Sequence, residues 1–210
     1  MVLLVERDGC VATLLILVDS LVYMREADGR RWDSSLSLVD GIYKVTGVRV
    51  TLVAVGGASF TGSFSKNYRT MFDYVIKQKA GVWAYTHLLV VSMGNDTYSH
   101  LRPFIPMESF AAYARNRFQT IGLVYGGSAE SWHYTRAKAL NYTRRVRQVL
   151  QFLYVRSAFD FLSDGASELC FDWECIADSI GHLRVAAFST LESAIIDWVV
   201  RVSGMRRSSL

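Results

Sequence analysis

The stretch LLILVDSL, residues 14–21, joins an apolar run of strand length to the polar pair Asp19-Ser20. An unbroken run of apolar residues is typical of a strand that is buried on both faces, as the strands of parallel sheets are. In α/β proteins the residues that follow such strands lie at the carboxyl edge of the sheet, where ligands bind. Taken alone, an Asp-Ser pair also suits a strand end or a helix cap. The stretch therefore predicts a central strand and makes Ser20 a candidate functional residue.

Other strand-like runs follow, and each ends in small or polar residues. Residues 48–55, 87–93 and 120–125 are apolar and rich in β-branched side chains. The first is followed by the small-residue loop 56–62, and the second by Gly-Asn-Asp at 94–96. A further strand is expected at 151–155, with 158–162 as the alternative.

Helical patterns alternate with these strands. Apolar residues recur at helical spacing over about 33–46, 65–79, 107–118, 131–150 and 184–202. Residues 21–31 are mixed and predict a short helix or a loop, and the prolines at 103 and 106 predict a loop before the helix at 107.

The alternation of strands and helices predicts an α/β fold, namely a three-layer α/β/α arrangement around a mostly parallel, flavodoxin-like five-stranded sheet. No repeat or change of composition marks a second domain. We therefore expect one domain over residues 1–210, with the candidate site residues within 12–202 and a frayed tail over 203–210.

Composition narrows the functional classes. A net charge of +4 is too small to indicate nucleic-acid binding. The cysteines, Cys10, Cys170 and Cys175, lack the spacing of a zinc set, so free thiols in a reducing compartment are the simpler interpretation. No apolar run has the length of a membrane span, and the first residues lack the pattern of a signal peptide. We expect no integral membrane segment and favour a cytoplasmic location.

Three candidate groups follow three successive strands: Ser20, Gly62 and Asn95. Because the ends of parallel strands lie along one edge, these groups can converge. Acyl transfer needs a nucleophile and hydrogen-bond donors for its oxyanion. The backbone N–H groups of Ser20 and Gly62 and the amide of Asn95 could supply those donors. A glycine also lets the backbone approach a substrate closely, since it has no Cβ.

A hydroxyl nucleophile also needs a base. Of the four histidines, only His182 lies beyond the last predicted strand, just before the final helix. Asp178 precedes it, and a carboxylate on one imidazole nitrogen fixes the tautomer and stabilises the imidazolium. His100, shortly after Asn95, is the reserve candidate for the base.

In this chain order, these blocks resemble the SGNH (GDSL-type) hydrolase superfamily of serine esterases and lipases. The matching stretches are residues 16–21, 59–62, 93–96 and 178–183. The resemblance implies a small three-layer fold that needs no metal or organic cofactor. It implies the following roles: nucleophile Ser20, oxyanion donors Ser20, Gly62 and Asn95, base His182 and orienting acid Asp178.

The chain departs from the family pattern at three points. Val18 stands where the family usually has glycine, and Met93 stands at another usual glycine position. Three residues rather than the usual two separate Asp178 from His182. Gly181 can absorb the extra residue, or the acid can be Asp172, or no carboxylate fills that role.

The resemblance implies a serine esterase that hydrolyses a carboxylic ester through an acyl-serine intermediate. Its partner would be a small-molecule or glycan ester rather than a nucleic acid. One alternative is acyl transfer to an alcohol, or deacetylation, on a sugar. Another is an SGNH-fold binding protein that has lost catalytic activity, for which the departures at Val18 and Met93 argue. The sequence carries no signal for an oligomeric state.

Overall fold

The fold is described from a computed structural model of the chain, over residues 2–7, 13–19, 23–25, 31–33, 35–79, 85–92, 95, 104–115, 117–125 and 185–203. Within these residues the main sheet has the strand order β1-β5-β2-β6-β7. Its strands are β1 (Val2–Arg7), β2 (Thr13–Val18), β5 (Arg49–Val55), β6 (His87–Ser92) and β7 (Thr120–Tyr125). All neighbours pair in parallel except β1, which runs antiparallel to β5 at the sheet edge.

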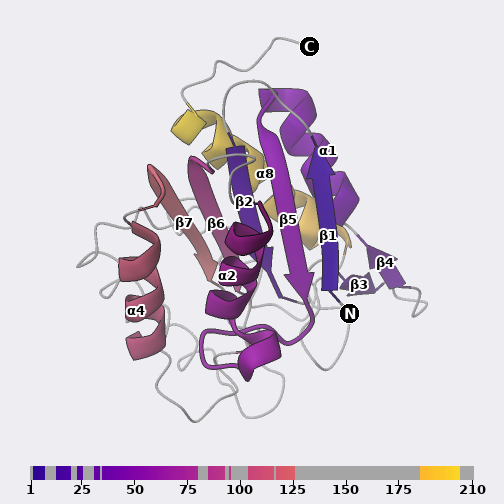
Figure 1. Cartoon of the computed structure of the whole chain (residues 1–210). Helices are drawn as coiled ribbons and strands as arrows, with labels where there is room; N and C mark the ends of the chain where they lie inside the picture. Colours follow the sequence, from indigo (N-terminus) through magenta and orange to yellow (C-terminus); the bar gives the residue numbers. More distant parts are fainter. Residues whose placement is uncertain are drawn as a thin grey trace.

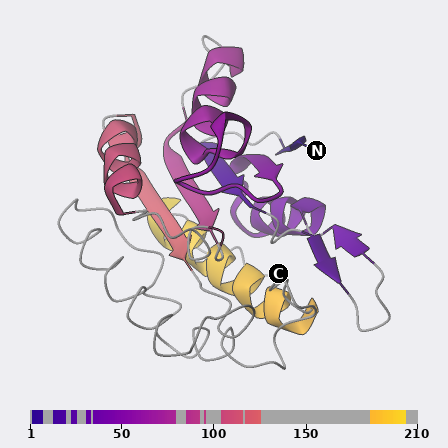
Figure 2. The same ribbon diagram turned by 90° about the horizontal axis from the view of Figure 1, so that it is seen from below.

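Helices cover both faces of the sheet (Figures 1 and 2). One face carries α1 (Ser35–Thr46) and α8 (Val185–Ser203), and the other carries α2 (Tyr68–Lys79) and α4 (Phe104–Arg115). The helices α1 and α8 also contact each other, because Ser37 Oγ donates to Glu192 Oε1 at 3.1 Å. The predicted three-layer α/β fold with a mostly parallel sheet is confirmed.

The strand β2 occupies the centre of the sheet between β5 and β6. Leu14, Leu15, Ile16 and Leu17 have no exposed surface, which explains why the run is apolar on both faces. The described strands β5, β6 and β7 match the runs predicted at 48–55, 87–93 and 120–125. The described helices match the predicted ranges as well, apart from α4.

Two predictions were wrong. Residues 21–31 were predicted as a helix or loop, but β3 (Tyr23–Arg25) and β4 (Arg31–Asp33) form an antiparallel hairpin. Aromatic residues favour strands, and the sequence between the two strands contains an Asp-Gly pair, which favours hairpin turns. The helix α4 begins at Phe104 rather than Met107, so Pro106 lies in its first turn instead of a loop. Proline is tolerated there because the first N–H groups of a helix have no partner within the helix.

The strand β1 had no predicted counterpart, since only its first residues are apolar. The helix predicted at 131–150 and the strand predicted at 151–155 or 158–162 lie outside the described residues. Within the part of the chain that the structure describes, we find no helix with the length and apolar character needed to cross a membrane.

The indole of Trp198 in α8 packs directly on β7 at Gly122. A Cβ built on Gly122 would lie 2.5 Å from Trp198 Cζ2 and 3.0 Å from Leu89 Cδ1. Both neighbours are buried, so neither can move away without opening the core. The close approach of α8 to the sheet therefore requires glycine at this position.

We predict that Gly122→Ala lowers the free energy of unfolding by about 1–3 kcal/mol, the usual cost of overpacking a core. Urea unfolding of the full chain measures this. Gly56→Ala is the matched control, because a Cβ at Gly56 meets nothing within 4 Å. Equal losses in the two variants would show that the indole contact does not set the requirement.

His87 begins β6, is 4% exposed, and its Nδ1 has no hydrogen-bond partner among the described residues. Burial lowers the pKa of His87 from its ordinary value of 6.5, because desolvation disfavours the charged imidazolium. As the pH falls below about 6.5, His87 therefore becomes protonated in the unfolded chain before it does so in the folded chain.

We expect the free energy of unfolding to fall as the pH drops below about 6.5 and to level off once the pH is below the pKa of the folded state. Replacing the imidazole in His87→Leu should remove this part of the pH dependence. Urea titrations from pH 8 to pH 5 compare the two chains. Identical slopes would mean that another group causes the pH dependence.

Candidate active site

The structure describes part of the predicted site. Gly62 and Asn95 lie within the described residues. Ser20, Asp178 and His182 lie outside them, as do the alternatives Asp172 and His100. The site is therefore built from the strand ends that flank these positions, beginning with Asp19, which directly precedes Ser20 in the sequence.

Asp19 fixes the end of β2 against β6. Its N–H donates to the carbonyl of Val91 at 3.3 Å, which extends the parallel ladder by one residue beyond Val18. The residue is only 1% exposed, so its side chain is held inside the protein rather than in solvent. A buried carboxylate needs hydrogen-bond donors to offset its lost hydration.

Asn95 provides one such donor and joins three strand ends. Its Nδ2 donates to Asp19 Oδ2 at 3.1 Å and to the carbonyl of Ala58 at 3.1 Å. Asp19 follows β2, Ala58 follows β5, and Asn95 follows β6. The carboxyl edge of the sheet thus brings together the loops in which the sequence placed its candidates.

These contacts fix the orientation of the Asn95 amide. The carbonyl of Ala58 can only accept, and a flipped amide would set Asn95 Oδ1 against it. Both hydrogens of Nδ2 therefore point to protein acceptors in this structure. A substrate oxyanion can receive one of them only by sharing it with, or displacing, Asp19 or Ala58.

The loop after β5 is anchored to the amino end of α2. Ser59 N–H donates to the Lys66 carbonyl at 2.9 Å, and Tyr68 N–H donates to the Ser59 carbonyl at 3.3 Å. The loop begins at Gly57, whose φ of +76° is a conformation that glycine adopts without strain. The segment 58–62 consequently lies against the first residues of α2.

Gly62 is required for a reason that the sequence did not reveal. A Cβ at Gly62 would collide with the Lys66 carbonyl oxygen, which is backbone and has little freedom to move. The sequence argument had assigned this glycine to close approach by a substrate. Within the described part of the chain the Gly62 N–H meets no acceptor, whereas its carbonyl accepts from Asn67 Nδ2 at 3.4 Å.

Tyr68 connects this loop to the end of β6. Its side chain has no exposed surface, and its hydroxyl donates to the Val91 carbonyl at 3.3 Å. Its ring lies 4.9 Å from that of Phe60, centroid to centroid. The Val91 carbonyl thus accepts from both the Asp19 N–H and the Tyr68 hydroxyl. One backbone oxygen therefore links the end of β2 to the first residue of α2.

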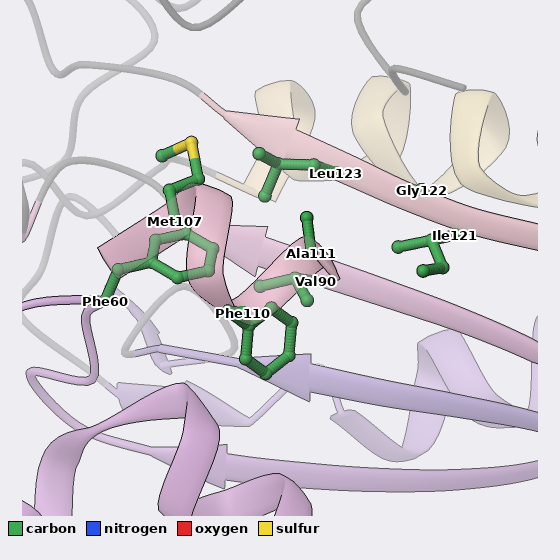
Figure 3. A pocket seen from close by; sticks show the side chains of 8 residues that line it. All are labelled: Phe60, Val90, Met107, Phe110, Ala111, Ile121, Gly122 and Leu123. Atoms are coloured by element: carbon green, nitrogen blue, oxygen red, sulfur yellow. The ribbon is translucent and has the colours of Figure 1, made fainter. Parts of the chain in front are cut away.

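An apolar cavity lies between α4 and the strands β6 and β7 (Figure 3). Phe60 contributes to its wall from the loop after β5, and Met107 and Phe110 contribute from α4. The full lining is Phe60, Val90, Met107, Phe110, Ala111, Ile121, Gly122 and Leu123. The lining residues carry no polar side chain, so the walls of this small cavity are apolar. Among the described residues no cluster of His, Cys, Asp or Glu could hold a metal ion.

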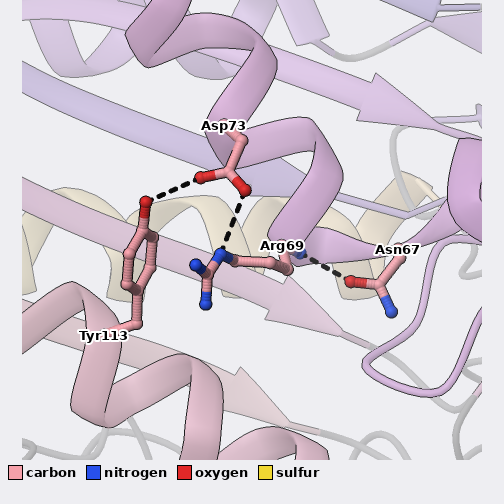
Figure 4. Close-up of polar contacts among 4 residues, drawn as sticks. All are labelled: Asn67, Arg69, Asp73 and Tyr113. Carbon is pink, nitrogen blue, oxygen red and sulfur yellow. Dashed lines mark hydrogen bonds and ion pairs between the residues drawn. The ribbon is translucent and has the colours of Figure 1, made fainter.

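On the outer surface a polar network braces α2 against α4 (Figure 4). Asp73 accepts from Arg69 Nε at 3.0 Å and from the Tyr113 hydroxyl at 2.9 Å. The guanidinium carbon of Arg69 also lies 3.1 Å from the centre of the Tyr113 ring. Because the Arg69 and Asp73 side chains are 43% and 47% exposed, solvent screens this pair and its contribution to stability is small.

Comparison with known proteins shows which solved structures share this fold. No family model and no curated protein sequence matches the chain. Among solved structures, a lipase/acylhydrolase from Enterococcus faecalis superposes with a TM-score of 0.66 at 11% identity, covering 95% of this chain and 100% of the other. A variant of the acetylxylan esterase Axe2 from Geobacillus stearothermophilus gives a TM-score of 0.63 at 18% identity, covering 96% and 99%.

This chain has the SGNH-hydrolase fold. The predicted resemblance is thereby confirmed at the level of the fold. The likeness extends over nearly the whole length of both chains.

Sequence reasoning missed two residues of the site. Tyr68 was predicted only as part of an apolar helix stripe, and its hydroxyl contact with Val91 has no sequence signature. Asn67 was placed inside a helix predicted to begin near Ser65. The preference of asparagine for the residue before a helix could have moved that start to Tyr68, where α2 begins.

We predict that Asp19→Ala lowers the free energy of unfolding by about 1–3 kcal/mol, because it leaves a hydrogen-bond donor of Asn95 without an acceptor. A double-mutant cycle with Asn95→Ala, measured by urea unfolding, should give a coupling energy of about 0.5–3 kcal/mol. Additive effects would show that the contact between these side chains does not stabilise the strand ends.

Proposed function

We propose that the protein is a serine ester hydrolase whose nucleophile is Ser20. The observation that carries the proposal is the junction of Asp19, Ala58 and Asn95 at the carboxyl edge of an SGNH-fold sheet. Ser20 follows Asp19 in the sequence. Asp19 is buried and is held by hydrogen bonds to the Val91 carbonyl and the Asn95 amide, so it anchors the chain immediately before the proposed nucleophile. A nucleophile gains most from such an anchor, because reaction rates depend steeply on its placement.

In the proposed mechanism His182 accepts the Ser20 proton while Ser20 Oγ attacks the ester carbonyl. Asp178 holds the imidazole in the required tautomer and stabilises the imidazolium. His182 then donates the proton to the leaving alcohol, and the acyl group remains on Ser20. Water activated by the same imidazole attacks the acyl carbonyl, which releases the acid and restores Ser20.

The oxyanion of each tetrahedral intermediate is proposed to accept from the N–H groups of Ser20 and Gly62 and from Asn95 Nδ2. The Gly62 N–H has no competing acceptor among the described residues, which suits this role. The Asn95 hydrogen directed at Ala58 would be shared with the oxyanion, while the hydrogen bond to Asp19 keeps the amide in place.

The structural neighbours support this assignment of residue types. Three of the acetylxylan esterase structures are catalytic mutants, changed to alanine at a serine, an aspartate or a histidine. Ser20, Asp178 and His182 are the same types in this chain. The name of that neighbour also favours an acetylated glycan as one substrate class to test, beside simple small-molecule esters.

Labelling with a fluorophosphonate probe tests the nucleophile. We expect the full-length protein to be labelled, Ser20→Ala to be unlabelled, and His182→Ala to be labelled at least 100-fold more slowly, in line with the loss of a general base. Ser63→Ala is the control, because it removes an exposed serine from the neighbouring loop. We expect this variant to be labelled as fast as the parent protein. Absence of labelling in the folded protein would overturn the mechanism and favour a binding protein that kept the fold.

Comparison of Asp178→Ala with Asp172→Ala tests the orienting acid. Loss of the acid should lower kcat for p-nitrophenyl acetate by about 10⁴-fold while KM changes little, because the imidazole then adopts the wrong tautomer. We expect Asp178→Ala to show this loss and Asp172→Ala to remain close to the parent protein. The reverse result would transfer the role to Asp172. Addition of an alcohol acceptor to the same assay separates hydrolysis from acyl transfer.

A further inference from the structure

Asn67 binds two structural elements through the two ends of one amide (Figure 4 shows the first). Its Oδ1 accepts from the N–H of Arg69 at 2.8 Å. Its backbone is extended, with φ −105° and ψ 132°, and α2 begins at the next residue. Asn67 is therefore the N-cap of α2, and its carbonyl oxygen satisfies one of the helix's unpaired N–H groups.

The other end of the Asn67 amide holds the loop after β5. Its Nδ2 donates to the carbonyl of Phe60 at 2.9 Å and to the carbonyl of Gly62 at 3.4 Å. The amide nitrogen has two hydrogens, so each carbonyl can receive one of them. The same residue also pairs with Ser59 in an isolated parallel bridge.

These contacts act on the peptide planes on either side of the Gly62 N–H. That N–H belongs to the peptide between Thr61 and Gly62. The Phe60 carbonyl belongs to the preceding peptide, and the Gly62 carbonyl to the following one. Because each peptide is planar, holding both of these carbonyls restricts the rotation of the plane between them. The Asn67 contacts thus limit the directions in which the Gly62 N–H can point.

We infer that Asn67 is a positioning residue that holds the Gly62 N–H for an oxyanion by tying the loop 60–62 to the amino end of α2. This inference rests on the proposed ester hydrolase function, in which Gly62 supplies an oxyanion donor. The loop has a second tether, because the Ser59 N–H bonds to the Lys66 carbonyl. That tether lies on the far side of Phe60 from Gly62, whereas the Asn67 contacts lie on both sides of the 61–62 peptide.

Asn67→Asp separates the two ends of the amide. A carboxylate still accepts from the Arg69 N–H and suits the positive end of a helix dipole, so α2 keeps its cap. It cannot donate, and it sets negative charge against the Phe60 and Gly62 carbonyls. Asn67→Ser keeps a cap and removes the donors without adding charge, so it separates loss of the tether from repulsion.

The first experiment is steady-state hydrolysis of p-nitrophenyl acetate by the full chain. We expect kcat to fall about 10- to 100-fold in both variants, less than the loss for removing an oxyanion donor altogether, with KM changed less than threefold. The affinity for a boronic acid inhibitor, which forms a tetrahedral adduct, should fall with kcat. Val75→Ala is the control, because it destabilises α2 from a buried position away from the loop. A kcat within twofold of the parent in both Asn67 variants would overturn the inference.

A second measurement keeps the inference separate from the proposed function. If the parent protein hydrolyses no ester and takes up no fluorophosphonate, the proposed function fails. Amide hydrogen exchange then tests the tether alone, and Asn67→Asp should speed exchange by at least tenfold at the hydrogen-bonded amides of Ser59 and Lys66, which lie on either side of the tethered residues, while Val75→Ala does not. Unchanged exchange at these residues would show that Asn67 does not hold the loop.

Discussion

The two amide hydrogens of Asn95 hold the carboxyl edge of the sheet together. One bonds to the buried carboxylate of Asp19 and the other to the backbone carbonyl of Ala58. Parallel strands are linked by their ladder hydrogen bonds only as far as the strands run, and the loops that follow them need separate contacts. An asparagine suits this place because one planar group can donate in two directions. Asp19 after β2, Ala58 after β5 and Asn95 after β6 are thereby linked to one another.

A second set of contacts transfers that order to the first turn of α2. The Val91 carbonyl accepts from Asp19 N–H and from the Tyr68 hydroxyl, so that β2, β6 and α2 meet at one oxygen. The Tyr68 ring also packs on Phe60, which in turn packs edge-on against Phe110 of α4. Aromatic pairs of this geometry add packing energy to the area that they bury. The loop that carries Gly62 is therefore held by the packing of Phe60 on Tyr68 and Phe110 and by its hydrogen bonds to the amino end of α2.

The sequence predicted the parts of the fold that repeat a pattern. The strands β2, β5, β6 and β7 are apolar runs because both of their faces are buried, and the helices between them carry apolar stripes. The strand β1 escaped prediction because it gains its place by antiparallel pairing with β5, from Val2 opposite Val55 to Arg7 opposite Val50. An edge strand can carry charged residues such as Glu6, so it shows no such pattern. The same reason applies to the β3–β4 hairpin, whose strands are three residues long.

In the candidate site, too, some features could be predicted from the sequence and others could not. The order of the strands predicts Ser20, Gly62 and Asn95 at one edge, because the ends of parallel strands meet there. Their supports were hidden, since the Ala58, Val91 and Lys66 contacts use backbone carbonyls that every residue possesses. No residue type in the sequence marks a carbonyl as an acceptor. Side chains in the sequence thus suggest a chemistry for the site, whereas the backbone contacts that support the strand ends could be found only in three dimensions.

Gly62 shows that a glycine can be required for a reason other than the one that the sequence suggests. Its lack of a Cβ was first explained by the approach of a substrate, but the Lys66 carbonyl already occupies the space that a Cβ would take. A glycine would be needed there whether or not the protein binds an ester. The presence of glycine therefore carries little weight for an oxyanion role. What does carry weight is the difference between its two backbone groups, since Asn67 satisfies the carbonyl while the N–H has no acceptor among the described residues. Hydrogen bonds to a charged acceptor are stronger than neutral ones, so a bound anionic oxygen would be a favourable acceptor for this N–H.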